Sequence, residues 1–390
     1  MPDAGLVHQV NVNGPGTHLI AIGIGCYHHL PGGPGTTTKH HLGLGQLSSP
    51  PISARAVASW FIEKFDCTER PLASVSLVVS EKTPQPFENP VTGQKFETLP
   101  TGTIEEVKTA LRQWITRAET DSRNSIILYF CGHGLSAGVQ NYYLMRDYGE
   151  DNEDPLFGAI NFRNLLSGLS TKKPSYQLLL FDACRLPNPM IELNRDGGQS
   201  IFVADPAGRL GAAETLQQCP IFATELDRAS LGFADQPSLC ARAFIRVMDG
   251  ASCRKEDGNW YVTTHRIVEA LSDFQNREAT KGDRVQSADA NNFAKFRLRR
   301  LKEIPRIPVF VRLNDPEKGK LVRITAARAN QPTQCISDPA APNFVAVGEF
   351  EAALEIGEYD FRAERIDLTA PASVVSEVVM PTYVDVNLAV

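Results

Sequence analysis

The feature that most constrains the fold is an alternation of short apolar runs with helical patterns between residues 17 and 183. The apolar runs are typical of buried strands and occupy residues 17–25, 73–80, 125–130 and 175–183. Apolar residues at helical spacing separate them, at residues 52–65, 101–119 and 161–169. Ser53 is the expected cap of the first of these helices, and Thr103 with Glu106 forms a capping-box signature in the second. This order predicts an α/β fold, a mostly parallel sheet flanked by helices on both faces.

The pattern changes near residue 304. From there to the C-terminus apolar and polar residues alternate between turn residues, without a helical signal. We therefore expect a small all-β, sandwich-like domain at residues 304–390, after an N-terminal tail at 1–15 and a first domain at 16–303.

Composition narrows the class of protein. The chain has 390 residues and a net charge of −6, which argues against a nucleic-acid surface, and the short basic run at 296–302 is interpreted as a solvated face. The N-terminus lacks the charged and apolar regions of a signal peptide, and no apolar run is long enough to span a membrane. The eight cysteines form no CxxC pair, so we expect reduced thiols in a cytoplasmic protein.

Two residues stand just past the ends of two predicted strands. His133 follows the strand at 125–130 within YFCGHG, and Cys184 follows the strand at 175–183 within FDACR. Active groups of open α/β sheets gather at the carboxyl ends of the strands, so the sequence predicts that the two meet on one edge.

The pair fits nucleophilic catalysis by a thiol. A free cysteine is mostly protonated at neutral pH, and a nearby imidazole stabilises the thiolate and later protonates the leaving amine. The glycines beside His133 leave room for a substrate backbone. The backbone N–H groups of Gly134 and Cys184 are the candidate oxyanion donors.

These motifs resemble the histidine and cysteine signatures of the caspase-like peptidases, including metacaspases and bacterial caspase homologues. His133 and Cys184 are 51 residues apart, close to the roughly 50 residues typical of caspases. The resemblance extends over about residues 15–300. It includes YYLMRD after the histidine and, later in the chain, a helix, a β segment and a second helix. The C-terminal β region is not part of it.

The resemblance implies roles for individual residues. It makes Cys184 the nucleophile and His133 the base. An acidic residue two positions before the cysteine lines the S1 pocket of metacaspase-like members and selects Arg or Lys, whereas animal caspases carry glutamine there and select Asp. Asp182 occupies this position, so we expect a basic P1 residue. Asp147 is a second acidic candidate for S1, with a turn or cap residue as its alternative.

Several residues have competing interpretations. Cys131 is expected to be a small packed residue, although the family often has serine there. The cluster of Cys26, His28, His29, His40 and His41 fits no common zinc spacing and is interpreted as part of a loop near the cleft, with no metal expected.

Caspase-like enzymes often carry a cleavable loop after the cysteine. With a basic P1 preference, Arg195 and Arg209 would be the self-cleavage sites, and an uncleaved surface loop is the alternative.

The sequence thus favours a caspase-like cysteine endopeptidase acting on a protein or peptide substrate. Bacterial relatives imply a partner effector such as a gasdermin-like pore former in antiviral defence, with the β domain as a docking module. The alternatives are a catalytically silent adaptor or binding module and a metal-dependent hydrolase. No cofactor, nucleic-acid partner or membrane partner is expected, while a calcium requirement and the oligomeric state stay open.

Overall fold

A computed structural model describes residues 3–389, except 138–139, 188–196, 213, 225–233, 279–287, 291–293, 316–319, 342–347 and 368–370. The chain divides into two compact units. The first comprises Met1–Ile245 with Thr263–Arg300, and the second comprises Arg246–Val262 with Leu301–Val390. Residues 246–262, which the sequence analysis assigned to the first domain, therefore pack with the C-terminal β region.

A seven-stranded sheet forms the centre of the first unit. Its order is β1 (Leu6–Gln9), β3 (Leu72–Ser80), β2 (Thr17–Ile24), β6 (Ser125–Gly132), β10 (Tyr176–Ala183), β12 (Gln217–Phe222) and β15 (Asp289–Ala290). The five inner strands are parallel, and β1 and β15 are antiparallel edges. The predicted mostly parallel sheet is confirmed, and its central strands β2 and β6 are buried along their whole length, as expected where both faces of a sheet are covered.

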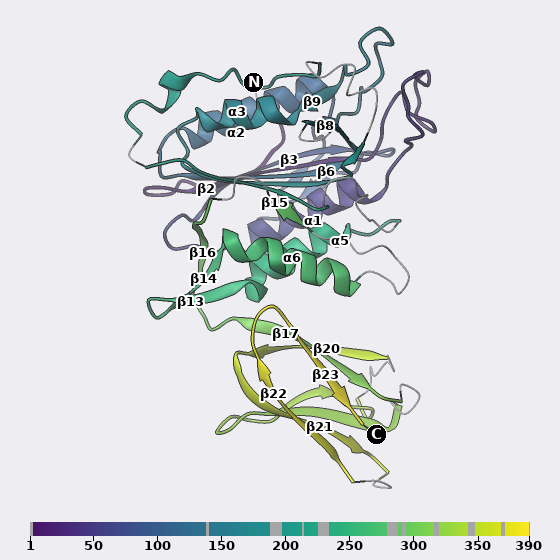
Figure 1. Cartoon of the computed structure of the whole chain (residues 1–390), viewed down its shortest axis with the longest axis vertical. Coiled ribbons are helices and arrows are strands. Elements are labelled where there is room, and N and C mark those ends of the chain that lie inside the picture. The colour runs from purple at the N-terminus through teal and green to yellow at the C-terminus, as the bar shows by residue number, and fades with distance from the viewer. Residues whose placement is uncertain are drawn as a thin grey trace. The chain divides into compact units, whose positions relative to one another are not determined.

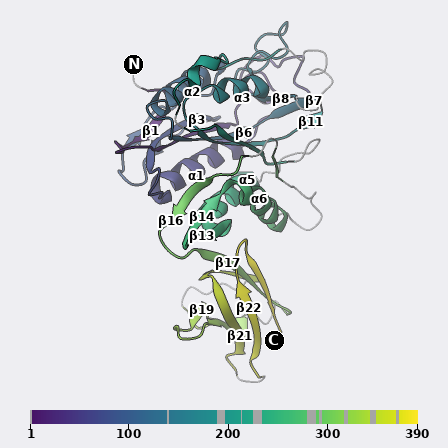
Figure 2. The ribbon, with the colours of Figure 1, turned by 60° about the vertical axis from the view of Figure 1, so that its left-hand side comes forward.

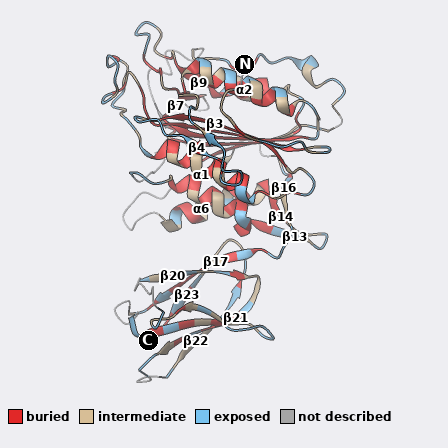
Figure 3. Ribbon diagram, turned by 180° about the vertical axis from the view of Figure 1, so that it is seen from behind, coloured by how far each residue is buried: buried red, intermediate tan, exposed pale blue. Residues whose placement is uncertain are grey.

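Helices cover both faces of this sheet (Figures 1 and 2). One face carries α2 (Ile104–Ala118) and α3 (Phe162–Ser170), and the other carries α1 (Ser49–Lys64), α5 (Leu239–Arg246) and α6 (Thr264–Glu278). Burial follows this layering, with the sheet and the helix surfaces against it buried and the outer helix surfaces exposed (Figure 3). Side chains also fix the layers directly: the indole of Trp114 donates to the carbonyl of His18 at 3.1 Å.

The helix starts test the capping predictions. At α2, Thr103 accepts from the N–H of Glu106 and the Glu106 carboxylate accepts from the N–H of Thr103, so the predicted capping box is confirmed. The prediction for Ser53 is wrong, because α1 begins at Ser49 with prolines in its first turn. Proline is tolerated there since the first N–H groups of a helix have no partner within it. Ser53 therefore lies inside the helix, where its hydroxyl donates to the carbonyl of Ser49.

Short elements surround the sheet. A four-stranded sheet has the order β11 (Leu186–Pro187), β7 (Gly134–Ala137), β8 (Gln140–Leu144) and β9 (Ala159–Asn161). The other short elements are the hairpin β4 (Phe87–Glu88) and β5 (Lys95–Phe96), the 3₁₀ helix η1 (Pro206–Arg209) and strand β16 (Arg297–Leu301). None of the described helices is long and apolar enough to cross a membrane.

The second unit is built around two facing sheets. They have the orders β20 (Glu349–Glu355), β17 (Arg306–Leu313), β23 (Val384–Leu388) and β19 (Gln334–Ser337), β18 (Val322–Ala327), β21 (Gly357–Arg365), β22 (Ser373–Val379). Inward side chains of both sheets share one apolar core, which confirms the predicted C-terminal β structure. The earlier segment adds a π-helical turn, η2 (Val247–Ala251), and the hairpin β13 (Cys253–Glu256) and β14 (Asn259–Thr263).

Candidate active site

His133 and Cys184 occupy equivalent positions at the ends of two neighbouring strands. β6 and β10 pair in parallel, with Gly132 opposite Ala183 as the last pair in register. His133 directly follows Gly132 at the end of β6, and Cys184 directly follows Ala183 at the end of β10. The structure thus brings the two to one carboxyl edge, as the strand order inferred from the sequence requires.

The His133 ring is held in one tautomer by a backbone carbonyl. Its Nε2 lies 2.8 Å from the carbonyl oxygen of Gly45. A carbonyl only accepts, so Nε2 carries the proton and Nδ1 keeps its lone pair. Burial lowers the pKa of His133 from its ordinary 6.5, and the hydrogen bond to Gly45 opposes that shift. The neutral form, which can take a proton at Nδ1, is therefore favoured at pH 7.

Tyr27 fixes the backbone at the same place. The N–H of His133 donates to the Tyr27 hydroxyl at 2.7 Å, and the two rings lie 4.9 Å apart. Burial keeps the pKa of Tyr27 above its usual range, so the hydroxyl stays intact as an acceptor. Sequence reasoning missed both Tyr27 and Gly45.

Gly134 lies directly against Cys184. A Cβ built on Gly134 would stand 2.5 Å from the Cys184 carbonyl oxygen, so a larger residue would displace that backbone. The carbonyl of His133 accepts from the N–H of Leu144 on β8. In a trans peptide the next N–H points the opposite way, so the Gly134 N–H is directed away from β8 and toward the β11 side. β11 begins two residues after Cys184, so this donor faces the side of the proposed nucleophile.

The cysteines differ in exposure. Cys184 is partly exposed, whereas Cys131 is buried. Burial, reinforced by the charge of Asp182, raises the pKa of Cys131 well above its usual range. Cys131 therefore stays a protonated thiol, which agrees with its interpretation as a packed residue.

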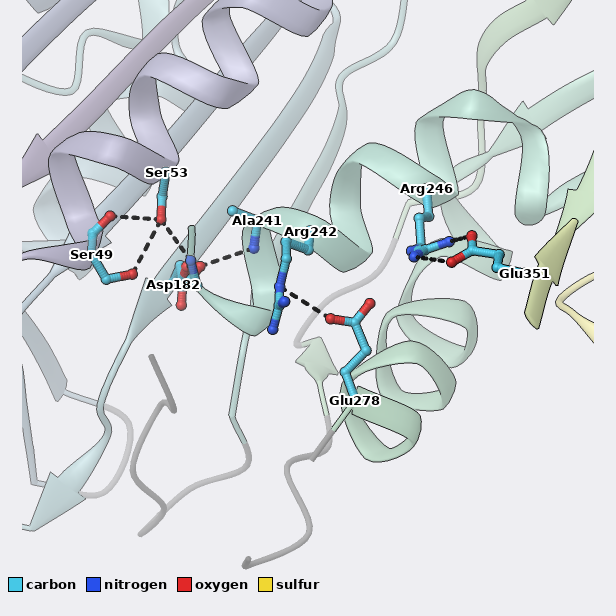
Figure 4. A network of polar contacts seen from close by, with 9 residues as sticks. Ser49, Ser53, Asp182, Ala241, Arg242, Arg246, Glu278 and Glu351 are labelled. Atoms are coloured by element: carbon cyan, nitrogen blue, oxygen red, sulfur yellow. Dashed lines mark hydrogen bonds and ion pairs between the residues drawn. The ribbon is translucent and has the colours of Figure 1, made fainter. Parts of the chain in front are cut away.

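Asp182 is the centre of a buried polar network (Figure 4). It is 2% exposed, and its Oδ2 accepts from the Tyr129 hydroxyl at 2.9 Å and from the hydroxyl of Ser238. Ser238 also accepts from the N–H of Ala241 in the first turn of α5, and its own N–H donates to Ser53 on α1. The network thus joins β6, β10, α1 and α5 around one carboxylate. Its part in an S1 pocket stays a prediction.

Asp147 lies in a different setting. Both of its carboxylate oxygens, at 3.0 and 3.1 Å, accept from the N–H of Ile104, the first residue of α2. Burial raises the pKa of Asp147, and the hydrogen bond from Ile104 opposes the rise. This arrangement favours the cap interpretation of Asp147 over a role in substrate binding.

The histidine-rich loop is held by separate contacts. His28 accepts from the guanidinium of Arg146 at 2.7 Å, and the His29 ring binds the carbonyl of Thr36. The rings of His40 and His41 bind Asn152 and Gly43. Within the described ranges no three metal-ligating side chains converge. The rings therefore act here as contacts within and around the loop.

Of the two predicted self-cleavage sites, the structure describes Arg209. Arg195 lies outside the described residues. The guanidinium of Arg209 donates to the carbonyls of Lys172 and Glu214 at 2.6 and 2.9 Å. It also donates to the hydroxyl of Ser175, at the start of β10, whereas Cys184 follows the other end of that strand. Eight strand residues span about 26 Å, so Arg209 is far from Cys184 of the same molecule in this conformation.

A family model agrees with these motifs. Residues 87–256 match the family model Peptidase_C14, the caspase domain, and this segment contains both His133 and Cys184. An uncharacterized protein of Sinorhizobium fredii, y4kE, is 26% identical over 238 residues, and the match covers 56% of this chain and 66% of the length of that relative. A crystal structure of caspase-1 from Spodoptera frugiperda is similar with a TM-score of 0.38 and 11% identity, covering 73% of this chain and 95% of the other.

The first unit thus combines a mostly parallel sheet with a histidine and a cysteine at its carboxyl edge, an arrangement suited to covalent catalysis by a thiol. The match over residues 87–256 confirms the caspase-like resemblance seen in the motifs.

Proposed function

We propose that this protein is a cysteine endopeptidase in which Cys184 is the nucleophile and His133 the general base. The observation that carries the proposal is the pair of adjacent strand ends, with the Gly45 carbonyl holding His133 in the tautomer that leaves Nδ1 basic. A scaffold that only binds would not need that tautomer.

The proposed chemistry follows from these positions. Nδ1 of His133 takes the proton of the Cys184 thiol, and the thiolate attacks the substrate carbonyl carbon. The Gly134 and Cys184 N–H groups stabilise the oxyanion. His133 then gives its proton to the leaving amine, and water attacks the acyl-enzyme to release the acid product and restore the thiol.

We further propose that the enzyme cleaves after Arg or Lys, with Asp182 as the S1 anion. A buried carboxylate attracts a cationic side chain more strongly than an exposed one because water screens it less. The Tyr129 and Ser238 hydroxyls fix the position of the carboxylate, which would direct the P1 side chain. Sequence motifs alone suggest the remaining features: a cytoplasmic enzyme, without a resident cofactor, that activates a protein partner such as a gasdermin-like effector.

The test compares the whole chain with Cys184→Ala and His133→Ala on a peptide mixture rich in Arg and Lys. Either substitution should lower kcat/KM by about 10³-fold or more while the circular dichroism spectrum is retained. Inhibition by a thiol alkylator but not by a chelator would separate this mechanism from a metal-dependent hydrolase. Full cleavage by either variant would contradict the assignment, and an inactive wild type would favour the adaptor alternative.

The same comparison can be made on a candidate partner by co-expression. The whole chain is the proper reagent, because Cys253 and Trp260 pack in the core of the second unit and truncation near Lys302 would uncover them. Cleavage of the partner by wild type and not by Cys184→Ala is the expected result. A partner that stays intact with both proteins would contradict its role as substrate.

A further inference from the structure

A cavity of about 760 Å³ opens at the same carboxyl edge as His133 and Cys184. Gly25 and Cys26, which follow β2, line it together with residues 81–84, which follow β3. Gln46 to Ser48 and the first turn of α1 complete the wall. Gln46 directly follows Gly45, whose carbonyl binds the His133 ring, so this wall continues the segment that orients the base.

Strand order places the cavity on one particular side of the catalytic pair. The strands lie in the order β10, β6, β2, β3 across the sheet. Cys184, His133 and the cavity therefore follow one another in that order along its carboxyl edge. The leaving amine must lie beside His133, because His133 protonates it. The residues after the scissile bond are therefore directed away from β10 and toward β2 and β3. Adjacent strands lie about 4.8 Å apart, so two to three extended residues bridge the distance from β6 to β3.

The wall is mainly apolar. Pro34, Leu47, Pro51, Ile52 and Pro84 contribute hydrocarbon surface. Two of the charged groups in the wall are bound by other side chains. Glu81 receives two hydrogen bonds from Arg55, at 2.8 and 2.9 Å, and Arg146 donates to His28 at 2.7 Å. Lys82 is exposed. The chemistry of the cavity thus suits an apolar side chain, with a basic group at its border.

We propose that this cavity is a subsite for the leaving-group side of the substrate and that it selects an apolar side chain within the first three residues after the cleaved bond. The inference rests on the proposed endopeptidase function and adds a specificity that the P1 residue does not provide. Ile52 is the residue of the α1 first turn that we assign to this selection, because its side chain is partly exposed in the wall.

The test uses two kinds of substrate with the same residues before the bond. One kind is a set of peptides with Arg at P1 and with Gly, Leu or Phe at each of the three following positions. The other is the matching aminocoumarin amide, which has no residue after the bond. The measured quantity is the ratio of kcat/KM for each peptide to kcat/KM for the amide.

In the wild type, Leu or Phe at one of the three positions should raise this ratio about tenfold over Gly, as expected for burial of one apolar side chain. Ile52→Ala should reduce that preference several-fold, whereas Leu166→Ala, a partly buried apolar residue of α3, should leave it unchanged. A preference for apolar residues that Ile52→Ala does not alter, or no preference in the wild type, would overturn the subsite. If neither peptides nor amide are cleaved, the endopeptidase function itself fails, and the subsite fails with it.

Discussion

Asp182 and Asp147 are both buried carboxylates of the first unit, but their donors differ in kind. Asp182 accepts from the hydroxyls of Tyr129 and Ser238, side chains that belong to different elements. Asp147 accepts from the backbone N–H of Ile104 at a helix start. A helix end needs acceptors whatever the protein does, so Asp147 has a sufficient structural reason to be acidic. The two hydroxyls could also donate to an uncharged amide oxygen, so these hydrogen bonds alone do not require an acidic residue at position 182.

The largest effect that can test this contrast is the loss of the Asp182 charge. In Asp182→Asn the amide oxygen can still accept from both hydroxyls, so we expect the fold to persist. Cleavage after Arg should fall by about 100-fold in kcat/KM, because a buried charge partner is removed. The measurement is the ratio of cleavage after Arg to cleavage after Gln in a peptide mixture. An unchanged ratio would mean that Asp182 is structural in the same way as Asp147.

A smaller effect is expected from removal of the Asp147 carboxylate. Asp147→Ala leaves the N–H of Ile104 without its acceptor at the start of α2, which should lower the free energy of unfolding by about 1 kcal/mol. The Arg-to-Gln cleavage ratio should stay at its wild-type value. Asp154→Ala is the matched control, since Asp154 accepts from the N–H of Leu156 in a turn and not at a helix start. If Asp147→Ala changes the cleavage ratio more than the stability, the cap interpretation is wrong.

The same contrast explains how much could be predicted from the sequence. The strand ends at His133 and Cys184 and the capping box at Thr103 were predictable, because each depends on residues close together in the chain or on the order of strands. The role of Gly45 was not, since it acts through a carbonyl that every residue possesses. The start of α1 was misplaced because two prolines within a helix's first turn look like a loop in sequence. The two hydroxyl donors to Asp182 come from separate parts of the chain, Tyr129 on β6 and Ser238 just before α5, and no local pattern relates Ser238 to Asp182.

The smallest predicted effect compares the pH dependence of two carboxyls at the α2 start. Burial opposes ionisation of Glu106, but hydrogen bonds from Thr101 and Thr103 outweigh it and lower its pKa from the ordinary 4.5. A lowered pKa in the folded state adds stability that is present above the unfolded pKa and is lost as pH falls through the folded pKa. Glu106→Gln should therefore cost about 0.5 kcal/mol at pH 7, since the carboxyl is only half-buried and solvent screens it. That difference should vanish on acidification below about pH 4.5.

The contribution of Asp147 to stability should depend on pH in the opposite direction, because burial raises the pKa of Asp147 from 3.8. The wild type loses stability as this carboxyl ionises with rising pH. The free energy of unfolding of Asp147→Asn should therefore rise relative to that of the wild type as the pH increases from about 3.8. Urea unfolding between pH 3 and 7 measures how the free energy of unfolding of each variant changes with pH relative to the wild type. Glu105→Gln, which removes an exposed charge in the same turn, is the control. If the stabilities of Glu106→Gln and Asp147→Asn change with pH in the same direction relative to the wild type, one of the two predicted pKa directions is wrong. A lowered pKa at Asp147 would mean that the hydrogen bond from Ile104 outweighs burial.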